Sequence, residues 1–208
     1  FSDVDQKSNW KILIIIAYIL NNEETFDLFY NPSIPEIVTN FLKPTSEQGC
    51  LIQALFLLNI ITERTDFSIS SDNTSFLISL LEDNSFCSDY KQLILTIITN
   101  NIDREISEEA SHVIYATAQS LLQNGNLSIK SLSLRLIQKI YQKYQFYIPN
   151  DELELYYSYA NSKYPDLSID GLNFFISYAK NENNMDQIIE YNLIEKLLQI
   201  SLYQNHKV

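Results

Sequence analysis

The chain offers few side chains that could act as catalytic bases or metal ligands. Its two histidines are far apart: His112 sits in a helical pattern beside Val113, and His206 lies near the C-terminus. The two cysteines, Cys50 and Cys87, cannot supply the clustered His and Cys ligands that a zinc site needs. Three scattered glycines cannot form a phosphate-binding loop. We therefore expect no catalytic residues, no metal and no cofactor, and we interpret the chain as a binding protein and not an enzyme.

One group of basic residues stands out in this acidic chain. Lys130, Arg135, Lys139 and Lys143 follow one another at intervals of five, four and four. Residues four apart lie on the same face of a helix, so the last three should project from one side. Two interpretations stay open. The row is either an ordinary solvated face or a local site for an acidic, carboxylate-bearing segment of a partner protein.

The overall charge narrows the classes of partner. The 208 residues carry a net charge of −12, which would repel a phosphate backbone or an anionic membrane surface. The most apolar run, Trp10–Leu20, is eleven residues long, about half of the ~20 that cross a bilayer. We expect a protein or peptide partner, no nucleic acid and no membrane insertion.

Both cysteines lie among apolar residues, which predicts buried, reduced thiols and a reducing compartment. The cytoplasm is the expected location, with the nucleus as the alternative. Because the chain begins at Phe1 without an initiator methionine, we expect it to be either trimmed at its start or a fragment of a longer protein.

The apolar runs of the sequence recur at a regular interval. If one residue from each of five apolar runs is taken as equivalent, the steps between these residues are 42, 39, 40 and 38. These residues are Leu13, Leu55, Ile94, Leu134 and Leu172. A second series has steps of 39, 41, 38 and 40 and consists of Leu42, Leu81, Leu122, Ala160 and Ile200. Two interleaved series that share a period near 40 indicate a repeat protein.

The spacing inside each run is helical. In the fourth run, Leu134, Ile137 and Ile140 fall three apart while Arg135 and Lys139 occupy the other side. Acidic pairs precede several runs, as expected where they complement the positive end of a helix dipole. With few glycines and prolines, the chain is predicted to be all-α.

Two stretches resemble a known repeat family. Ser33–Leu42, followed by Pro44 and then Ala54–Ile61, looks like the second and third helices of an armadillo repeat. Asp186–Ile200 is similar to the first two helices of another. The family usually has a glycine in the turn before the second helix. Here Asn31 and Asn192 occupy that place, and asparagine is the next best residue for a left-handed backbone.

The resemblance implies a right-handed α-solenoid, a superhelix of armadillo-like repeats that spans residues 1–208. Residues 1–21 would end the third helix of a partial repeat, and 182–208 would form another partial repeat. Full repeats are expected over 22–66, 67–103, 104–144 and 145–181. First helices are hard to see around Phe67–Ser71 and Gln145–Ile148. HEAT-like helix pairs are therefore the alternative architecture.

In the armadillo family the third helices line a concave groove that binds extended peptides. Members that carry nuclear-import cargo present a ladder of Trp and Asn there, four residues apart. The matching positions here are Ile14 and Tyr18, Phe56 and Ile60, Leu95 and Thr99, Arg135 and Lys139, and Asn173 and Ser177. Trp is absent from all of them, so the import ladder is not reproduced.

The resemblance therefore implies a scaffold or adaptor that binds a partner segment along its concave face. The predicted contact residues are Tyr18, Phe56, Arg135, Lys139, Lys143, Asn173 and Ser177. The alternatives are a divergent importin-alpha-type nuclear transport adaptor and a regulatory domain of a larger protein. Uncapped terminal repeats also allow self-association.

Overall fold

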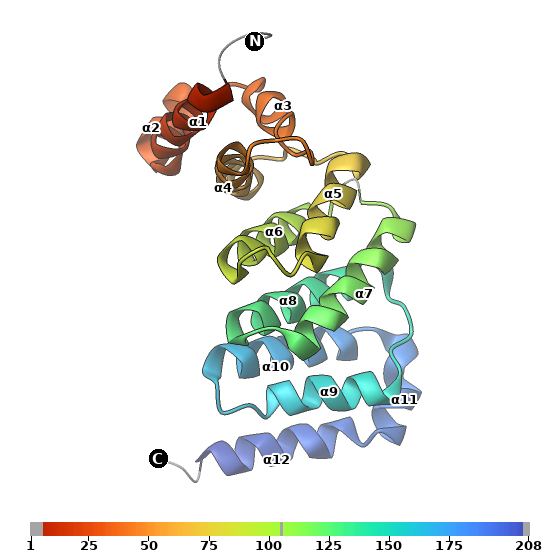
Figure 1. Cartoon of the computed structure of the whole chain (residues 1–208). Helices are drawn as coiled ribbons and strands as arrows, with labels where there is room; N and C mark the ends of the chain where they lie inside the picture. The colour runs from red at the N-terminus through yellow and green to blue at the C-terminus, as the bar shows by residue number, and fades with distance from the viewer. Residues whose placement is uncertain (1–5, 105, 206–208) are drawn as a thin grey trace. The chain divides into compact units, whose positions relative to one another are not determined.

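The computed structural model describes residues 6–104 and 106–205, and these are all-helical (Figure 1). The all-α prediction is confirmed, since no strand occurs in the described residues. In chain order the elements are α1 (Gln6–Asn21), α2 (Glu23–Phe29), α3 (Ile34–Thr39), α4 (Gln48–Arg64), α5 (Ser71–Glu82), α6 (Ser88–Asn101), α7 (Glu108–Asn124), α8 (Leu127–Tyr144), α9 (Asn150–Ala160), α10 (Pro165–Ala179), the 3₁₀ turn η1 (Glu182–Asn184), α11 (Met185–Glu190) and α12 (Leu193–Asn205).

The helices form two compact units. Unit 1 comprises residues 1–117 and unit 2 residues 118–208, so that the boundary falls inside α7. The sequence was predicted to form one continuous solenoid over its whole length, and that arrangement stays a prediction. Each unit is described separately below.

Unit 1 is organised around α4, which packs against α1, α3 and α6. Helix α2 packs against α1, and α5 against α6. The core is aliphatic: Ala54, Leu55, Leu57 and Leu58 of α4 are all completely buried. On α6, Ile94 is likewise fully buried. We call the five equivalent residues of the first series landmarks, and the helices that carry them, α1, α4, α6, α8 and α10, landmark helices. Successive landmark helices, α1, α4 and α6, are thus direct neighbours in this unit.

Two arginines secure the ends of the helices in unit 1. The Arg64 guanidinium donates to the Leu20 and Asn21 carbonyl oxygens at 3.1 and 2.9 Å, at the end of α1. Forty residues later, Arg104 donates to the Thr62 and Thr65 carbonyl oxygens at 3.0 and 2.6 Å, at the end of α4. The last carbonyls of a helix have no partner within the helix, so each arginine satisfies acceptors left open by the preceding unit of the repeat.

Unit 2 is organised around α10, which packs against α8 and α9 and contacts η1. Its core is aromatic: Tyr141, Tyr156, Phe174, Phe175 and Tyr178 are each no more than 1% exposed. The rings of Tyr156 and Phe174 meet edge to face at 4.4 Å, and Tyr141 and Tyr178 lie 5.4 Å apart. Edge-to-face and tilted arrangements suit aromatic quadrupoles. α9 and α10 approach closely at Gly171, where a Cβ would come within 2.5 Å of the Ala160 backbone nitrogen.

Local sequence explains most helix boundaries. Acidic pairs occupy the first turns of α2, α7 and α9, as predicted. The Asn126 side chain caps α8 by accepting from the Ile129 N–H at 3.0 Å. Asn192 adopts the predicted left-handed backbone with φ of 55°. The same prediction for Asn31 is wrong, because its side chain forms a local turn by accepting from the Ser33 N–H.

The predicted repeat ranges differ in helix content. The range 22–66 contains three helices, α2, α3 and α4, whereas 67–103, 104–144 and 145–181 each contain two in their described residues. Residues 66–70 and 145–149 are non-helical.

The long-range hydrogen bonds of the described residues follow the period of the sequence. They join residues separated by 32 positions, as from Ile69 to Asn101, up to 44, as from Leu20 to Arg64, whereas helices adjacent in the chain are joined by shorter spans, as Lys91 and Leu81 are. In unit 2 the Tyr157–Lys196 and Ser131–Asp170 bonds both span 39 positions. A helix therefore bonds to its equivalent one period away.

The cysteine prediction is half wrong. Cys50 is buried at 3% exposure, and desolvation raises the pKa of its thiol. Cys87 precedes α6 and is exposed.

Candidate functional site

The predicted contact residues of unit 2 meet at the α8–α10 interface. Arg135 on α8 forms an ion pair with Asp170 on α10, with 2.8 Å between Nε and Oδ1. The Asp170 side chain is only 4% exposed and also accepts a hydrogen bond from Ser131, whereas the Arg135 side chain is 51% exposed. The buried carboxylate is thus compensated by a half-exposed cation. Arg135 has a structural role here, and its contact with a partner stays a prediction.

Glutamine side chains continue this interface toward the C-terminal end of α8. Gln138 Nε2 donates to Ser177 Oγ at 2.8 Å and to the Asn173 carbonyl oxygen at 3.2 Å. Gln142 Nε2 donates to the same Ser177 Oγ at 2.7 Å. Ser177 is therefore buried between the two helices, while the Asn173 residue is exposed. Of the predicted pair, Asn173 is the accessible residue.

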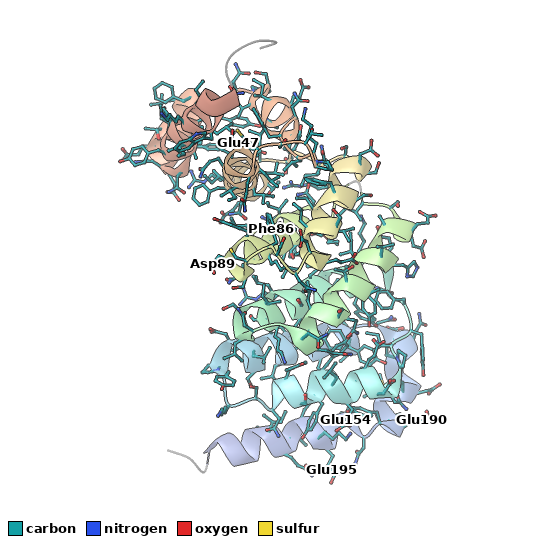
Figure 2. All side chains as sticks on the ribbon, viewed as in Figure 1. Glu47, Phe86, Asp89, Glu154, Glu190 and Glu195 are labelled. Carbon is teal, nitrogen blue, oxygen red and sulfur yellow. The ribbon has the colours of Figure 1, made fainter. Side chains whose placement is uncertain are left out.

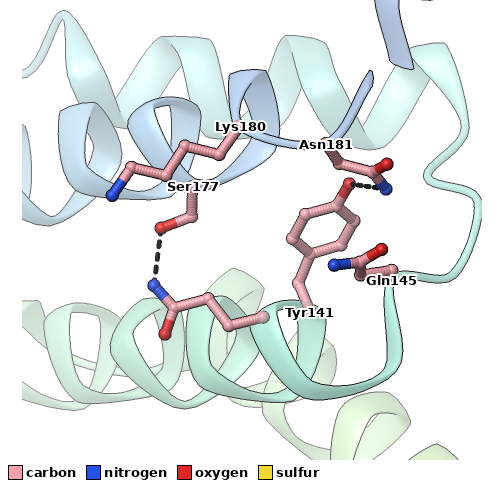
Figure 3. Close-up of a pocket in the computed structure, with 6 residues that line it drawn as sticks. Tyr141, Gln145, Ser177, Lys180 and Asn181 are labelled. Carbon is pink, nitrogen blue, oxygen red and sulfur yellow. Dashed lines mark hydrogen bonds between the residues drawn. The ribbon is translucent and has the colours of Figure 1, made fainter. Parts of the chain in front are cut away.

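A pocket of about 290 Å³ opens where α8 and α10 end (Figure 3). It is lined by Tyr141, Gln142, Gln145, Ser177, Lys180 and Asn181. The hydroxyl of the buried Tyr141 accepts from Asn181 Nδ2 at 3.1 Å, which fixes one wall. Side-chain amides both donate and accept hydrogen bonds, and the lysine adds a positive charge. Such a lining can hold a polar ligand with a carboxylate.

The geometry of the pocket depends on the way α8 ends. Gln145 has a left-handed backbone with φ of 49°, and its N–H bonds to the Tyr141 carbonyl oxygen at 2.8 Å. A left-handed residue commonly terminates a helix, although glycine is the usual choice. This turn places the Gln145 side chain beside the rim of the pocket (Figure 3).

One basic side chain lines this pocket, and two more lie close to Gln142 in the sequence of α8. Lys180 lines the pocket directly and is exposed. Lys143 is exposed one residue beyond Gln142, and its ammonium lies 5.1 Å from the centre of the Tyr144 ring. Lys139, one turn earlier on α8, is half-buried.

The balance of charge differs between the units. Unit 1 contains 17 acidic and six basic residues, whereas unit 2 contains nine and eight. Almost all of the net charge of −12 thus belongs to unit 1. A carboxylate that approaches the pocket meets a nearly neutral unit with a locally basic face.

The predicted groove positions of unit 1 do not share one exposed face. Tyr18 on α1 is 84% exposed and Phe56 on α4 is 40% exposed. The equivalent positions one repeat later, Ile60 for Tyr18 and Leu95 for Phe56, are buried, at 4% and 0%. The structure therefore presents isolated exposed aromatics in this unit and not a ladder.

A second polar cluster joins α9 to α12. The carboxylate of Glu154, which is labelled in Figure 2, accepts from Lys196 Nζ at 2.7 Å and from the Tyr191 hydroxyl at 2.6 Å. These two hydrogen bonds hold the pKa of Glu154 below its ordinary value. The Lys196 ammonium also lies 3.6 Å from the centre of the Tyr191 ring. These contacts connect α9 to the α12 region, and in them the charged groups of Glu154 and Lys196 pair with each other.

Other sites weighed from the sequence find no support in geometry. No group of three His, Cys, Asp or Glu side chains that could hold a metal ion occurs in the described part of the chain. His112 lies on α7, and His206 falls outside the described residues. Within the described residues, every helix is too short or too polar to cross a membrane.

Of the six residues that line the pocket, the sequence predicted only Ser177 as a contact residue. It did not identify Tyr141, Gln142, Gln145, Lys180 or Asn181, nor Arg104 in unit 1. The signal for the arginines was present, since Arg64 and Arg104 are 40 residues apart. The pocket residues carry no comparable signal, because they occur at the ends of two helices of different length.

Comparison with known proteins shows the fold alone. No protein-family model matches the sequence, and no curated protein matches it. The chain is similar to the crystal structure of an engineered protein from the Northeast Structural Genomics Consortium, with a TM-score of 0.67 and 13% sequence identity. The match covers 95% of this chain and 84% of that one. At this identity the likeness extends to the helical fold and not to function.

Proposed function

We propose that the chain is a protein-interaction scaffold, an α-solenoid of armadillo-like and HEAT-like repeats, and that it catalyses no reaction. Its binding site is the α8–α10 pocket with the basic residues Lys139, Lys143 and Lys180. The ligand is a segment of a partner protein that carries an acidic side chain. The observation that carries the proposal is a pocket lined by amides and a lysine in an otherwise acidic chain.

The solenoid part of the proposal is supported by the period of the contacts. Landmark helices one period apart pack together in each unit, as α4 does with α6 and α8 with α10. The long-range hydrogen bonds span 32 to 44 residues. Repeat proteins in which each repeat contacts only its neighbours have this property. Stacked repeats present a surface on which an extended segment can lie.

The chemistry of the pocket supports an acidic ligand. Lysine ammonium groups attract carboxylates at the rim, where the pairing is worth less than about 1 kcal/mol for each exposed pair. Amides of Gln142, Gln145 and Asn181 match the donors and acceptors of a peptide backbone. The affinity should therefore come from several weak contacts, and it should fall as salt screens the charges.

Charge reversal around the pocket tests this proposal. The probe is an extended peptide with two glutamates, and its binding to the 208-residue chain is measured by fluorescence anisotropy. The double variant Lys143→Glu, Lys180→Glu should bind at least about tenfold more weakly, equivalent to about 1.4 kcal/mol. Lys163→Glu is the matched control, because Lys163 is exposed in the same unit but does not line the pocket. It should bind as the unmodified chain does.

Equal binding by the pocket variant and the Lys163→Glu control would refute the proposed site. Arg135→Glu is unsuitable as a test, since it would also leave the Asp170 carboxylate buried without its cation. A drop in affinity for that variant would not separate binding from stability.

A second function, a divergent importin-alpha-type adaptor, is favoured by the charge of unit 1. With 17 acidic and six basic residues, this unit would attract a Lys-rich signal. This alternative predicts that the chain binds a Lys-rich peptide. Tyr18→Ala or Phe56→Ala should weaken that binding, and the double variant Lys143→Glu, Lys180→Glu should leave it unchanged. A chain that binds only the acidic peptide would exclude this alternative.

A further inference from the structure

Two faces of the chain expose apolar side chains at positions whose equivalents on other helices contact a neighbouring helix. The first, which we name the head face, consists of Ile12, Ile15 and Tyr18 on α1, which are 44%, 60% and 84% exposed. The second, the tail face, consists of Ile169 and Ile176 on α10, which are 54% and 55% exposed.

The head face is the row that other landmark helices bury. If Leu13 and Leu55 are equivalent, the head-face residues correspond to Ala54, Leu57 and Ile60 of α4, with exposures of 0%, 0% and 4%. In α10 the same alignment through Leu172 gives Gly171, Phe174 and Ser177, which are all buried. This row of α10 packs onto α8 and α9, for Ser177 bonds to Gln138 and Gln142, and Phe174 meets Tyr156.

The tail face is the other half of the same interface. If Leu134 and Leu172 are equivalent, Ile169 and Ile176 correspond to Ser131 and Gln138 of α8. Those two residues contact α10 directly, since Ser131 bonds to Asp170 and Gln138 bonds to Ser177. On α10 the equivalent positions are apolar and exposed. The tail face is thus placed to receive a helix that packs as α10 packs on α8.

We infer that the head face of one copy of this chain docks on the tail face of a second copy. Helix α1 of one molecule would lie against α10 of another and continue the α8–α10 packing by one step. The inference goes beyond the proposed scaffold function, and it rests only on the repeat equivalence of α1, α8 and α10. Because the two surfaces differ, the contact is heterologous, and each copy that joins brings a further open face, so association continues beyond a dimer.

Charge favours this pairing over the symmetric one that buries the head face. The head face belongs to unit 1, with 17 acidic and six basic residues, and the tail face to unit 2, with nine and eight. Head-to-head docking would bring two strongly acidic units together, whereas head-to-tail docking brings one against a nearly neutral unit. The few apolar side chains on each face imply weak association, with a Kd between about 1 mM and 1 μM.

The experiment is sedimentation velocity on the purified 208-residue chain over a concentration series. The unmodified chain should grow beyond a dimer as its concentration rises. A head variant, Ile15→Glu with Tyr18→Glu, and a tail variant, Ile169→Glu with Ile176→Glu, should each be monomeric. All four substituted side chains are exposed, so far-UV circular dichroism should be unchanged. The control Tyr147→Glu changes a tyrosine that is 73% exposed outside both faces and should associate normally.

Mixing the two variants gives the decisive result. The head variant keeps its tail face and the tail variant keeps its head face, so a mixture should form a dimer of twice 24.2 kDa and nothing larger. An unmodified chain that stays monomeric to about 1 mM, a variant that self-associates alone, or a mixture that stays monomeric would each overturn the inference. Because none of these substitutions touches the α8–α10 pocket, acidic-peptide binding by the monomeric variants separates this result from the fate of the proposed function.

Discussion

The two units hold neighbouring helices together by different chemistry. In unit 1 the core is aliphatic, and cations from Arg64 and Arg104 cover the carbonyl ends of the preceding helices. In unit 2 the core is aromatic, and side chains bond to side chains across α8 and α10, as Arg135 does with Asp170. One helical period thus tolerates different ways of joining its members, provided that the buried acceptors of each junction are satisfied.

The two units also differ in the groups that they expose. The amides and lysines that join or flank α8 and α10 leave polar groups at a pocket rim, whereas the arginines of unit 1 are turned inward onto backbone carbonyls. Unit 2 therefore exposes polar groups around a pocket. Unit 1 carries most of the negative charge.

The largest expected effect separates the two cores. Phe174→Ala, in the aromatic cluster, should lower the free energy of unfolding by about 3–5 kcal/mol, and Leu57→Ala in unit 1 by about 2–5 kcal/mol. Trp10, the one tryptophan of the chain, lies on α1, so its fluorescence reports on unit 1. Phe174→Ala should shift the urea midpoint of the tyrosine near-UV signal and leave the Trp10 midpoint in place. A joint shift of both probes would contradict separate cores.

The next largest effect tests the basic side chains that bond to carbonyl oxygens at helix ends in unit 1. Arg104→Met keeps the apolar stem but removes the bonds to the Thr62, Thr65 and Phe67 carbonyls. Hydrogen bonds from a charged donor are worth about 1.5–3 kcal/mol, and we expect a loss in this range from Trp10 fluorescence during urea unfolding. Lys91→Met removes a single bond to the Leu81 carbonyl and should cost less. An equal loss for both would show that the number of capped carbonyls does not matter.

A pair of glycines gives effects of opposite sign in the two units. Gly171→Ala would place a Cβ 2.5 Å from the Ala160 nitrogen and push α9 from α10, at a cost of about 1–3 kcal/mol. Gly49→Ala on α4 would place a Cβ 3.7 Å from Trp10 Cβ, an ordinary contact, and should stabilise by up to about 1 kcal/mol. Thermal melting of both variants measures this. If Gly171→Ala raises the melting temperature, the close approach of α9 and α10 is wrong.

The smallest effect depends on pH. The pKa of Glu154 is lowered by Lys196 and Tyr191 in the folded chain, so its contribution is present above the unfolded-state pKa and is lost as pH falls through the folded value. Since the carboxylate is largely exposed, Glu154→Gln should cost less than about 1 kcal/mol at neutral pH. The difference from the unmodified chain should vanish in acid. A difference that persists at low pH would assign it to packing.

The sequence predicts the fold at apolar positions that recur with the 40-residue period and are buried. Leu55, Ile94 and Leu134 are landmarks of the 40-residue period, and each is completely buried. Apolar spacing alone identifies such positions, because each helix must bury one face against its neighbours. The segments 66–70 and 145–149, where no first helix was visible, contain none.

The site was only partly accessible from sequence. The row Arg135, Lys139 and Lys143 follows directly from helical spacing. The pairing of Arg135 with Asp170 and the burial of Ser177 depend on how α8 meets α10, which spacing within one helix does not encode. Gln145, whose left-handed backbone shapes the rim, lacks the glycine or asparagine signature of such positions.

The central claim is that each helix pair is stabilised by its neighbours one period away. Hydrogen–deuterium exchange of the Phe174→Ala variant tests it most directly. We predict faster exchange in α8, α9 and α10, with α4 and α6 protected as in the unmodified chain. Uniformly faster exchange over both units would contradict the claim, since it would show that the effect of a core side chain is not confined to its neighbours one period away.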